Sequence, residues 1–328
     1  MNVCPAERDP RLADAGSGSS KMTRCRIPRN LPGLHVFFIV VKIHRQMVHI
    51  RHLNSSMAMT DSSQYVIRGG VEGRERLRVL SRVMHESSTS LFDRLGLRDG
   101  LRCVDVGCGG GDTTLELARR VGPYGRAVGF DIDQIKLDIA RKEAFQQGVA
   151  NVDFQACDVC TLDAESQFDV GYARFLLTHL KAPGAALAAI YRTLRPGGVF
   201  AVEDIDFSGS FTYPESRAFR RYHDLYCATV SRRGGDPNIG LRLPNLLTQA
   251  GFQEIGMHVV QPIGFQGEVK LLSPLTMENI SEAVMADGLA TREEIDQVVR
   301  ELYEFAADPN TVGGVPRVIQ AWGRRPLA

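Results

Sequence analysis

The 328-residue chain lacks any long apolar run and any internal repeat. Its apolar run near the start, Val36 to Val41, has six residues. A membrane-spanning helix needs about 20. The run also lies too far from the start, without a small-residue cleavage site, to be an ordinary signal peptide. These absences predict a protein without a membrane anchor, located in the cytoplasm.

The chain also has almost no net charge, with 39 basic and 38 acidic residues. The first 58 residues hold nine Lys and Arg and three Asp and Glu, which leaves 30 basic and 35 acidic residues for the rest. The body is therefore mildly acidic, whereas a protein that binds phosphate backbones is usually basic. Nucleic acid is not expected as its main partner.

A disulfide framework is not expected either. The seven cysteines are an odd number, and three of them fall in expected strands or in a glycine loop. Cys157 and Cys160 form one CxxC pair without a second pair or a nearby His, which is more typical of a strand end than of a metal or redox site. No metal is predicted, and this use of cysteine also indicates the cytosol.

The first 58 residues differ from the rest. Residues 1–32 contain Arg, Ser and Pro without periodicity, which is typical of disorder. Met57 and Met59 directly precede the first patterned segment, so the preferred hypothesis is that translation starts at one of them and that the stretch before it is not translated. Residues 59–328 are expected to form one domain that begins with a helical segment, residues 65–97.

Apolar runs and helix-period stripes alternate along this domain. Strands are expected at 101–106, 126–131, 152–156, 168–173, 198–203, 253–265 and 315–323. Helices are expected at 71–95, 112–121, 133–147, 182–194, 215–233, 241–250, around 277–287 and at 291–307. Such alternation predicts an α/β fold, a mostly parallel sheet with helices on both faces. Two insertions, 207–240 and 274–308, are expected to form helical lids, and Thr291 to Glu294 is a capping box that opens the last helix.

The most informative segment is Val104 to Asp112, with the pattern D-x-G-x-G-x-G between a strand and a helix. Glycines let a backbone approach a ligand, and a helix start offers unpaired N–H groups, so this is the opening of a nucleotide-binding unit. Asp131, at the end of the next strand, is placed to accept two hydrogen bonds from a ribose diol. Its alternative role is an N-cap of the helix that follows. A nicotinamide loop needs a small residue where Asp112 stands, so that template fails.

This pattern resembles motif I of the class I S-adenosylmethionine-dependent methyltransferases. Asp131 matches the ribose acid of that superfamily, and Asp158 with Val159 matches its adenine-edge contact. Residues 168–174 resemble the fourth motif and residues 194–198 the turn before the fifth strand. The resemblance covers roughly residues 65–325. It implies a Rossmann-like, seven-stranded, mostly parallel sheet and S-adenosylmethionine as the cofactor.

The resemblance also implies roles on the nucleoside side of the cofactor. Asp131, next to Ile132, binds the ribose hydroxyls. Asp158 accepts from the adenine amine while the Val159 N–H serves a ring nitrogen, and the alternative for Asp158 is a turn aspartate.

On the amino-acid side, the backbone of the glycine loop lies against the cofactor's tail. Asp105 binds its ammonium through water or braces the loop. The carboxylate of the cofactor's tail should bind a cation, and the expected residues are Arg74 together with Tyr65, or Arg68 in place of Arg74. The alternative is that Arg74 is a solvated charge at the start of the helix. Arg174 faces the same cleft or pairs with a loop carboxylate. The expected cofactor contacts are Tyr65, Arg74, Asp105, Gly107, Cys108, Gly109, Asp131, Ile132, Asp158, Val159 and Arg174.

Methyl transfer from a sulfonium needs mainly a positioned nucleophile, and a base only where the acceptor must lose a proton. The candidate bases are Asp206 and Glu203, at the end of the fifth strand, and His223 in the first lid. Strand alternation puts Glu203 and Asp204 on opposite faces of the sheet, so at most part of this cluster faces the substrate. The alternative to a base role is that these carboxylates anchor the lid. His179 is interpreted as structural. Aromatic residues could line an acceptor pocket or simply pack in the lid: Phe211, Tyr213, Tyr222 and Tyr226.

Helical lids that exclude water suit small acceptors. The sequence therefore predicts a methyltransferase acting on an O, N or C nucleophile of a small molecule, in secondary metabolism, and leaves room for a homodimer. Alternatives are a non-catalytic cofactor-binding protein and a methyltransferase acting on protein or tRNA.

Overall fold

The computed structural model describes residue 67 and residues 73–162 and 165–327, all within one compact unit, residues 61–328. The expectations for residues 1–58 and for Tyr65 and Arg68 lie outside the described residues.

Seven strands form one sheet in the order β3-β2-β1-β4-β5-β9-β6. Neighbours from β3 to β5 are parallel, whereas β9 runs antiparallel to both β5 and β6. The strands are β1 (Arg102–Val106), β2 (Arg126–Asp131), β3 (Val152–Ala156), β4 (Phe168–Arg174), β5 (Leu194–Asp206), β6 (Gln253–Val260) and β9 (Arg317–Arg324). A separate short pair joins β7 (Ile263–Gly264) and β8 (Gly313–Gly314). The predicted α/β fold class is confirmed.

Helices cover both faces of the sheet because successive strand residues are apolar and point to opposite sides. One face packs against α2 (Arg74–Arg94), α3 (Asp112–Arg120) and α4 (Gln134–Gln146). The other face packs against α5 (Pro183–Thr193) and α7 (Leu243–Gln249). Short 3-10 turns connect several elements: η1 (Val159–Thr161), η2 (Leu177–His179), η3 (Phe207–Gly209), η4 (Ile239–Arg242) and η5 (Glu268–Leu271).

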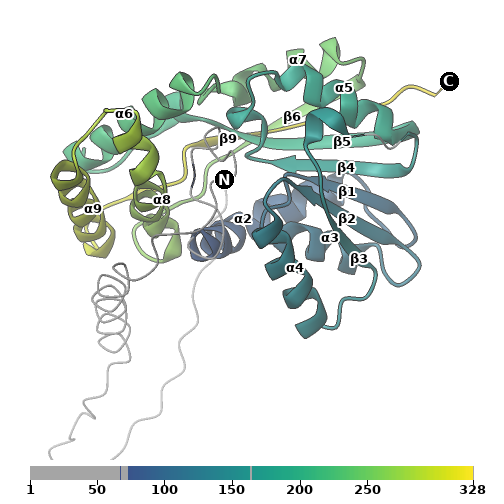
Figure 1. Cartoon of the computed structure of the whole chain (residues 1–328), viewed down its shortest axis with the longest axis horizontal. Helices are drawn as coiled ribbons and strands as arrows, with labels where there is room; N and C mark the ends of the chain where they lie inside the picture. The colour runs from purple at the N-terminus through teal and green to yellow at the C-terminus, as the bar shows by residue number, and fades with distance from the viewer. Residues whose placement is uncertain (1–66, 68–72, 163–164, 328) are drawn as a thin grey trace, which may run out of the picture. The chain divides into compact units, whose positions relative to one another are not determined.

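Three further helices form the two insertions. They are α6 (Arg217–Arg232), α8 (Leu272–Ala286) and α9 (Arg292–Ala307), and they share an apolar core with α2. They lie together at one end of the sheet (Figure 1). The Thr291 hydroxyl accepts the Glu294 N–H at 3.3 Å, as the expected N-cap does, but the Glu294 carboxylate binds Arg221 instead of closing the capping box.

Two expected strand bounds were wrong. The fifth strand begins at Leu194, because residues on both sides of the expected turn pair with β4. The sixth strand ends at Val260, since Pro262 has no N–H to continue a ladder, and β7 pairs with β8 instead.

Candidate cofactor-binding site

The loop between β1 and α3 is built from glycines in left-handed backbone conformations. Gly107, Gly109 and Gly111 have φ angles of 73°, 54° and 81°. Residues with a Cβ rarely adopt these angles, so the sequence G-x-G-x-G permits this tight turn. At Gly111, a Cβ would also lie 2.7 Å from the ring of Phe154. The loop is therefore both tightly turned and closely packed at the carboxyl end of β1.

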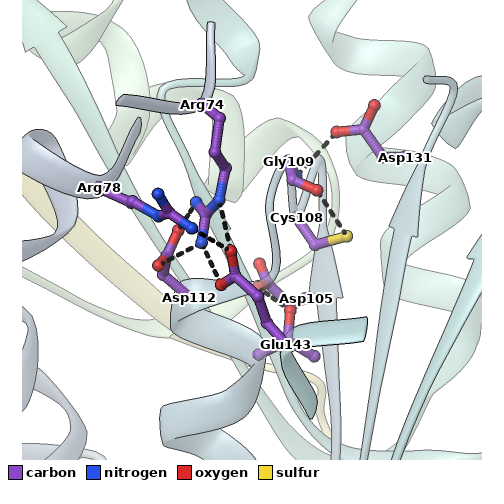
Figure 2. A network of polar contacts seen from close by, with 9 residues as sticks. Arg74, Arg78, Asp105, Cys108, Gly109, Asp112, Asp131 and Glu143 are labelled. Carbon is purple, nitrogen blue, oxygen red and sulfur yellow. Dashed lines mark hydrogen bonds and ion pairs between the residues drawn. The ribbon is translucent and has the colours of Figure 1, made fainter. Parts of the chain in front are cut away.

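Hydrogen bonds hold this loop against the end of β2. The N–H groups of Gly107 and Cys108 both donate to the Phe130 carbonyl, at 2.7 and 2.9 Å. The Gly109 N–H donates to Oδ2 of Asp131 at 2.8 Å, and Figure 2 shows this carboxylate facing the loop. The structure thus joins the two segments that sequence reasoning singled out.

Asp131 is not the N-cap of α4, so that alternative was wrong. The cap is Asp133, whose carboxylate accepts the N–H groups of Ile135 and Lys136. Oδ1 of Asp131 accepts the Asp133 N–H at 2.9 Å. Each oxygen of a carboxylate can accept more than one hydrogen bond, so both oxygens of Asp131 retain capacity for a sugar hydroxyl.

The predicted adenine side lies beyond Asp131. The Ile132 side chain is 68% exposed, which leaves an apolar surface beside the carboxylate. Asp158 is exposed and is the N-cap of η1, where its Oδ1 accepts the Cys160 N–H at 2.9 Å, as expected of a turn aspartate. Val159 is buried. Contacts from Asp158 and Val159 to adenine stay a prediction.

Asp105 lies beneath the loop. Its carboxyl group is 2% exposed and accepts the Thr114 hydroxyl at 2.7 Å. Burial raises the pKa of Asp105 to about 6, against the lowering effects of that hydrogen bond and of Arg174. The geometry supports the loop-bracing interpretation, because the bond joins β1 to the first turn of α3.

Arg74 belongs to an ion-pair cluster that sequence reasoning missed. Its guanidinium is 5% exposed and binds Asp112 and Glu143, with Nη2–Asp112 Oδ1 at 2.9 Å and Nε–Glu143 Oε1 at 3.0 Å (Figure 2). Arg78 also binds Glu143, at 2.8 Å. Burial acts to raise the pKa of Glu143, but its bonds to the two arginines hold it below the ordinary value. Arg74 thus braces α2 against α3 and α4, and the structure gives no support to its binding the cofactor's carboxylate.

Arg174 ends β4, and its Nη1 lies 3.3 Å from the Ser88 hydroxyl. The residue also lines a groove of about 200 Å³ between α2 and α3, together with Asp112. A role of Arg174 toward the cofactor's tail stays a prediction.

The carboxylates that end β5 are already engaged. Glu203 and Asp206 are both 0% exposed. Glu203 accepts from Ser88 at 2.6 Å, from Gln320 at 2.6 Å and from the Tyr172 hydroxyl. This geometry argues for bracing of α2 and against a general base at Glu203.

Asp206 is held by its own lid. It accepts from Nε of Arg317 at 2.7 Å and from the Ser208 hydroxyl at 2.6 Å. With both oxygens bonded inside the protein, the geometry favours the alternative that Asp206 anchors the start of the lid, and a base role for Asp206 stays a prediction. Asp204 points to the opposite face from Glu203, toward the N–H of Thr178 at 3.1 Å, as strand alternation requires.

The third candidate base, His223, lies on α6 with Nε2 3.2 Å from the Phe207 carbonyl. Tyr222 and Tyr226 are 3% and 2% exposed and pack with Phe207, so they belong to the lid core. Phe211 and Tyr213 are instead 46% and 70% exposed. A base role for His223 stays a prediction.

Within the described part of the chain, no group of three His, Cys, Asp or Glu residues could hold a metal ion. Cys157 and Cys160, both described, are free thiols. Among the helices that the structure describes, none is long and apolar enough to cross a membrane.

A seven-stranded sheet with one reversed strand, and a glycine loop bound to an acid at the end of the second strand, are typical of nucleoside-binding α/β domains. Residues 97–235 match the family model described as a methyltransferase domain. This match confirms the resemblance of the motifs to the class I methyltransferases, whose cofactor is S-adenosylmethionine.

Two curated proteins illustrate the similarity. The ubiquinone/menaquinone biosynthesis C-methyltransferase UbiE of Stutzerimonas stutzeri (strain A1501) is 34% identical over 133 residues, 40% of this chain and 50% of the relative. An uncharacterized 37.1 kDa protein in transposon TN4556 of Streptomyces fradiae is 32% identical over 164 residues, 49% of this chain and 46% of the relative. The chain thus spans about half the length of the curated relatives it matches.

The fold has a solved counterpart in a proposed methyltransferase from Bacillus halodurans C-125. Its TM-score is 0.50 at 18% identity, covering 73% of this chain and 98% of that one. At this identity the likeness concerns the fold alone.

Proposed function

We propose that this protein transfers a methyl group from S-adenosylmethionine to an O, N or C nucleophile of a small molecule. The observation that carries the proposal is the glycine loop, whose Gly109 N–H binds the Asp131 carboxylate inside a matched methyltransferase domain. Ligands of open α/β sheets bind at the carboxyl ends of the strands, which is where these residues lie.

The residues at this edge fit the nucleoside part of the cofactor. Asp131 offers two carboxylate oxygens to a ribose diol, and exposed Ile132 offers an apolar surface to a base. The left-handed glycines let the backbone approach an amino-acid tail without a Cβ in the way. When bound, the cofactor supplies a methyl group on a cationic sulfur, which is a good leaving group.

The protein's own contribution is then mainly orientation. Holding two reactants in line can lower a barrier by about 7–11 kcal/mol. Glu203 and Asp206 of β5 are bonded within the protein, so they brace α2 and the start of the first lid. The lid helices α6, α8 and α9 pack with α2, and such a cover suits the exclusion of water from a small site.

The acceptor class rests on the relatives and on charge. UbiE is named as a C-methyltransferase of ubiquinone/menaquinone biosynthesis, which favours a small organic acceptor and includes carbon among the acceptor atoms. The acidic body of the chain disfavours tRNA. A place in secondary metabolism and a homodimer stay predictions.

The test is calorimetry followed by transfer. Purified protein should bind S-adenosylhomocysteine, and a metabolite extract with radiolabelled S-adenosylmethionine should yield a labelled small molecule. Binding without transfer to any extract, protein or tRNA fraction would favour the non-catalytic alternative. No binding of either nucleoside by folded protein would reject the proposal.

A further inference from the structure

Two arginines in the first turn of α2 have opposite surroundings. Arg74 binds two carboxylates. Arg76 is buried to a similar degree, at 9% exposure, yet its Nε donates to a neutral group, the Thr276 hydroxyl, at 2.9 Å. Within the part of the chain that the structure describes, no carboxylate lies within ion-pair distance of Arg76. A buried guanidinium is costly unless an anion accompanies it, so Arg76 has a charge that an anionic ligand would balance.

The guanidinium of Arg76 is held in place. Thr276 lies on α8 and donates its own hydroxyl to the Leu272 carbonyl at 2.6 Å. A hydroxyl has one proton, so Thr276 can only accept from Arg76. The side chain of Arg76 is thereby aimed at the lid helix α8, whereas Arg74 lies against the glycine loop, with Nη1 2.4 Å from where a Gly110 Cβ would stand.

Two more basic groups lie near Arg76. Burial, together with the positive charges of Arg76 and Lys136, lowers the pKa of His179 to about 3. His179 ends η2, just after β4, and Lys136 lies in the first turn of α4, just after β2. Lys136 has a carboxylate, Asp133, at 3.6 Å. Because Lys136 is paired with Asp133 and His179 is neutral, these two groups leave the positive charge of Arg76 itself unbalanced.

Neutral hydrogen-bonding groups complete the surroundings. Tyr222 is 3% exposed, and burial raises its pKa to about 12, against the lowering effect of Arg76, so its hydroxyl remains a donor. Asn279 lies one turn after Thr276 on α8, hence on the same helix face. Its Nδ2 donates to the Leu275 carbonyl at 2.7 Å, but its buried Oδ1 has no donor. Buried polar atoms are rarely left without a partner, so this oxygen indicates a missing hydrogen-bond donor, such as an N–H or O–H of a ligand, and does not itself attract the anion.

We propose that the methyl acceptor carries an anionic group, a carboxylate or a phosphate, which Arg76 binds between α2 and the lid helix α8. This rests on the proposed methyltransferase function. The cofactor's own carboxylate is the competing ligand. We favour the acceptor over the cofactor as the ligand of Arg76, because Arg76 is bonded to α8 of the second lid insertion. The glycine loop, which is proposed to bind the cofactor, lies instead against Arg74.

The test is calorimetry on protein saturated with S-adenosylhomocysteine. The probes are benzoate and phenyl phosphate, and the neutral benzamide is their shape-matched control. At least one anion should bind more tightly than benzamide. In Arg76→Gln, its Kd should rise about 10-fold or more, the scale of a lost charge-assisted hydrogen bond, while the Kd of S-adenosylhomocysteine stays unchanged. Arg82→Gln removes an equal charge from an exposed position of α2 and should change neither value.

Other outcomes reject the proposal. Anions that bind no better than benzamide, or equally well to Arg76→Gln, would show that Arg76 holds no acceptor anion. A loss of S-adenosylhomocysteine affinity in Arg76→Gln, with anion binding intact, would assign Arg76 to the cofactor. If Arg76→Gln fails to fold, Arg76→Lys keeps the charge but not the two-pronged geometry, and it should weaken phenyl phosphate binding while retaining the fold. Failure of wild-type protein to bind S-adenosylhomocysteine would instead reject the methyltransferase function itself.

Discussion

At the end of β2, each oxygen of Asp131 already accepts one backbone N–H, from Gly109 and from Asp133. These bonds orient the carboxylate before any ligand arrives. Asp131→Ala is expected to weaken S-adenosylhomocysteine binding by roughly 1–3 kcal/mol, the scale of buried hydrogen bonds left unmade. Isothermal titration calorimetry measures this change. The control, Asp138→Ala, removes an exposed carboxylate of α4 and should leave the affinity intact. Equal affinity of Asp131→Ala and wild type would remove Asp131 from the site.

Gly107 tests the loop at the same scale. It has a φ of 73°, and an added Cβ would lie 2.9 Å from Cδ1 of Leu176. Gly107→Val should therefore abolish cofactor binding. Gly148 has a similar φ of 67° with nothing within 4 Å of an added Cβ. Gly148→Val should cost about 1–2 kcal/mol of folding stability from backbone strain but bind the cofactor normally. Calorimetry measures cofactor binding and thermal unfolding measures stability, so the two variants together separate backbone strain from obstruction of the cofactor by the new side chain. Normal binding by Gly107→Val would contradict the assignment of the loop to the cofactor.

At the scale of elements, the position of α2 depends on Arg74. Its two carboxylate partners come from α3 and α4, 38 and 69 residues away along the chain. Arg74→Met should lower the free energy of unfolding by about 2–4 kcal/mol, because it leaves the partly buried Asp112 without its cation and Glu143 with Arg78 alone. The exposed pair between Arg82 and Glu268 provides the control, since Arg82→Met should cost less than about 1 kcal/mol. Urea unfolding measures both, and equal losses would show that Arg74 does not brace α2.

Most elements could be predicted from the sequence because their signals are local. Apolar runs and their turns gave strands 126–131 and 152–156 with the observed bounds. The Thr291 cap likewise placed the start of α9. Partnerships between distant residues could not be predicted in this way. Nothing near Arg74 in the sequence indicates Glu143, and nothing near Asp206 indicates Arg317. For that reason the sequence could single out the glycine loop and Asp131, but it could not indicate the partners of Arg74 and Asp206.

At the scale of the whole molecule, buried carboxyl groups should make stability depend on pH. Asp204 is 0% exposed, and burial raises its pKa from 3.8 to about 7. The folded state therefore holds a proton that the unfolded state releases near pH 4, so this group's stabilisation is full below pH 4 and is lost as the pH rises toward 7.

Asp204→Asn removes this titration. Between pH 4 and pH 7, wild type should lose roughly 2–4 kcal/mol more stability than the variant. Asp105, whose pKa is raised to about 6, should leave the variant with a smaller loss of the same sign. Urea unfolding at several pH values measures both slopes. Parallel curves for wild type and variant would show that Asp204 is ionised in the folded protein.

The most direct test of the account is a crystal structure of the protein with S-adenosylhomocysteine. We expect both ribose hydroxyls within hydrogen-bond distance of the Asp131 carboxylate, with the amino-acid tail against the glycine loop. A nucleoside bound elsewhere on the sheet, or a ribose that does not contact Asp131, would contradict it.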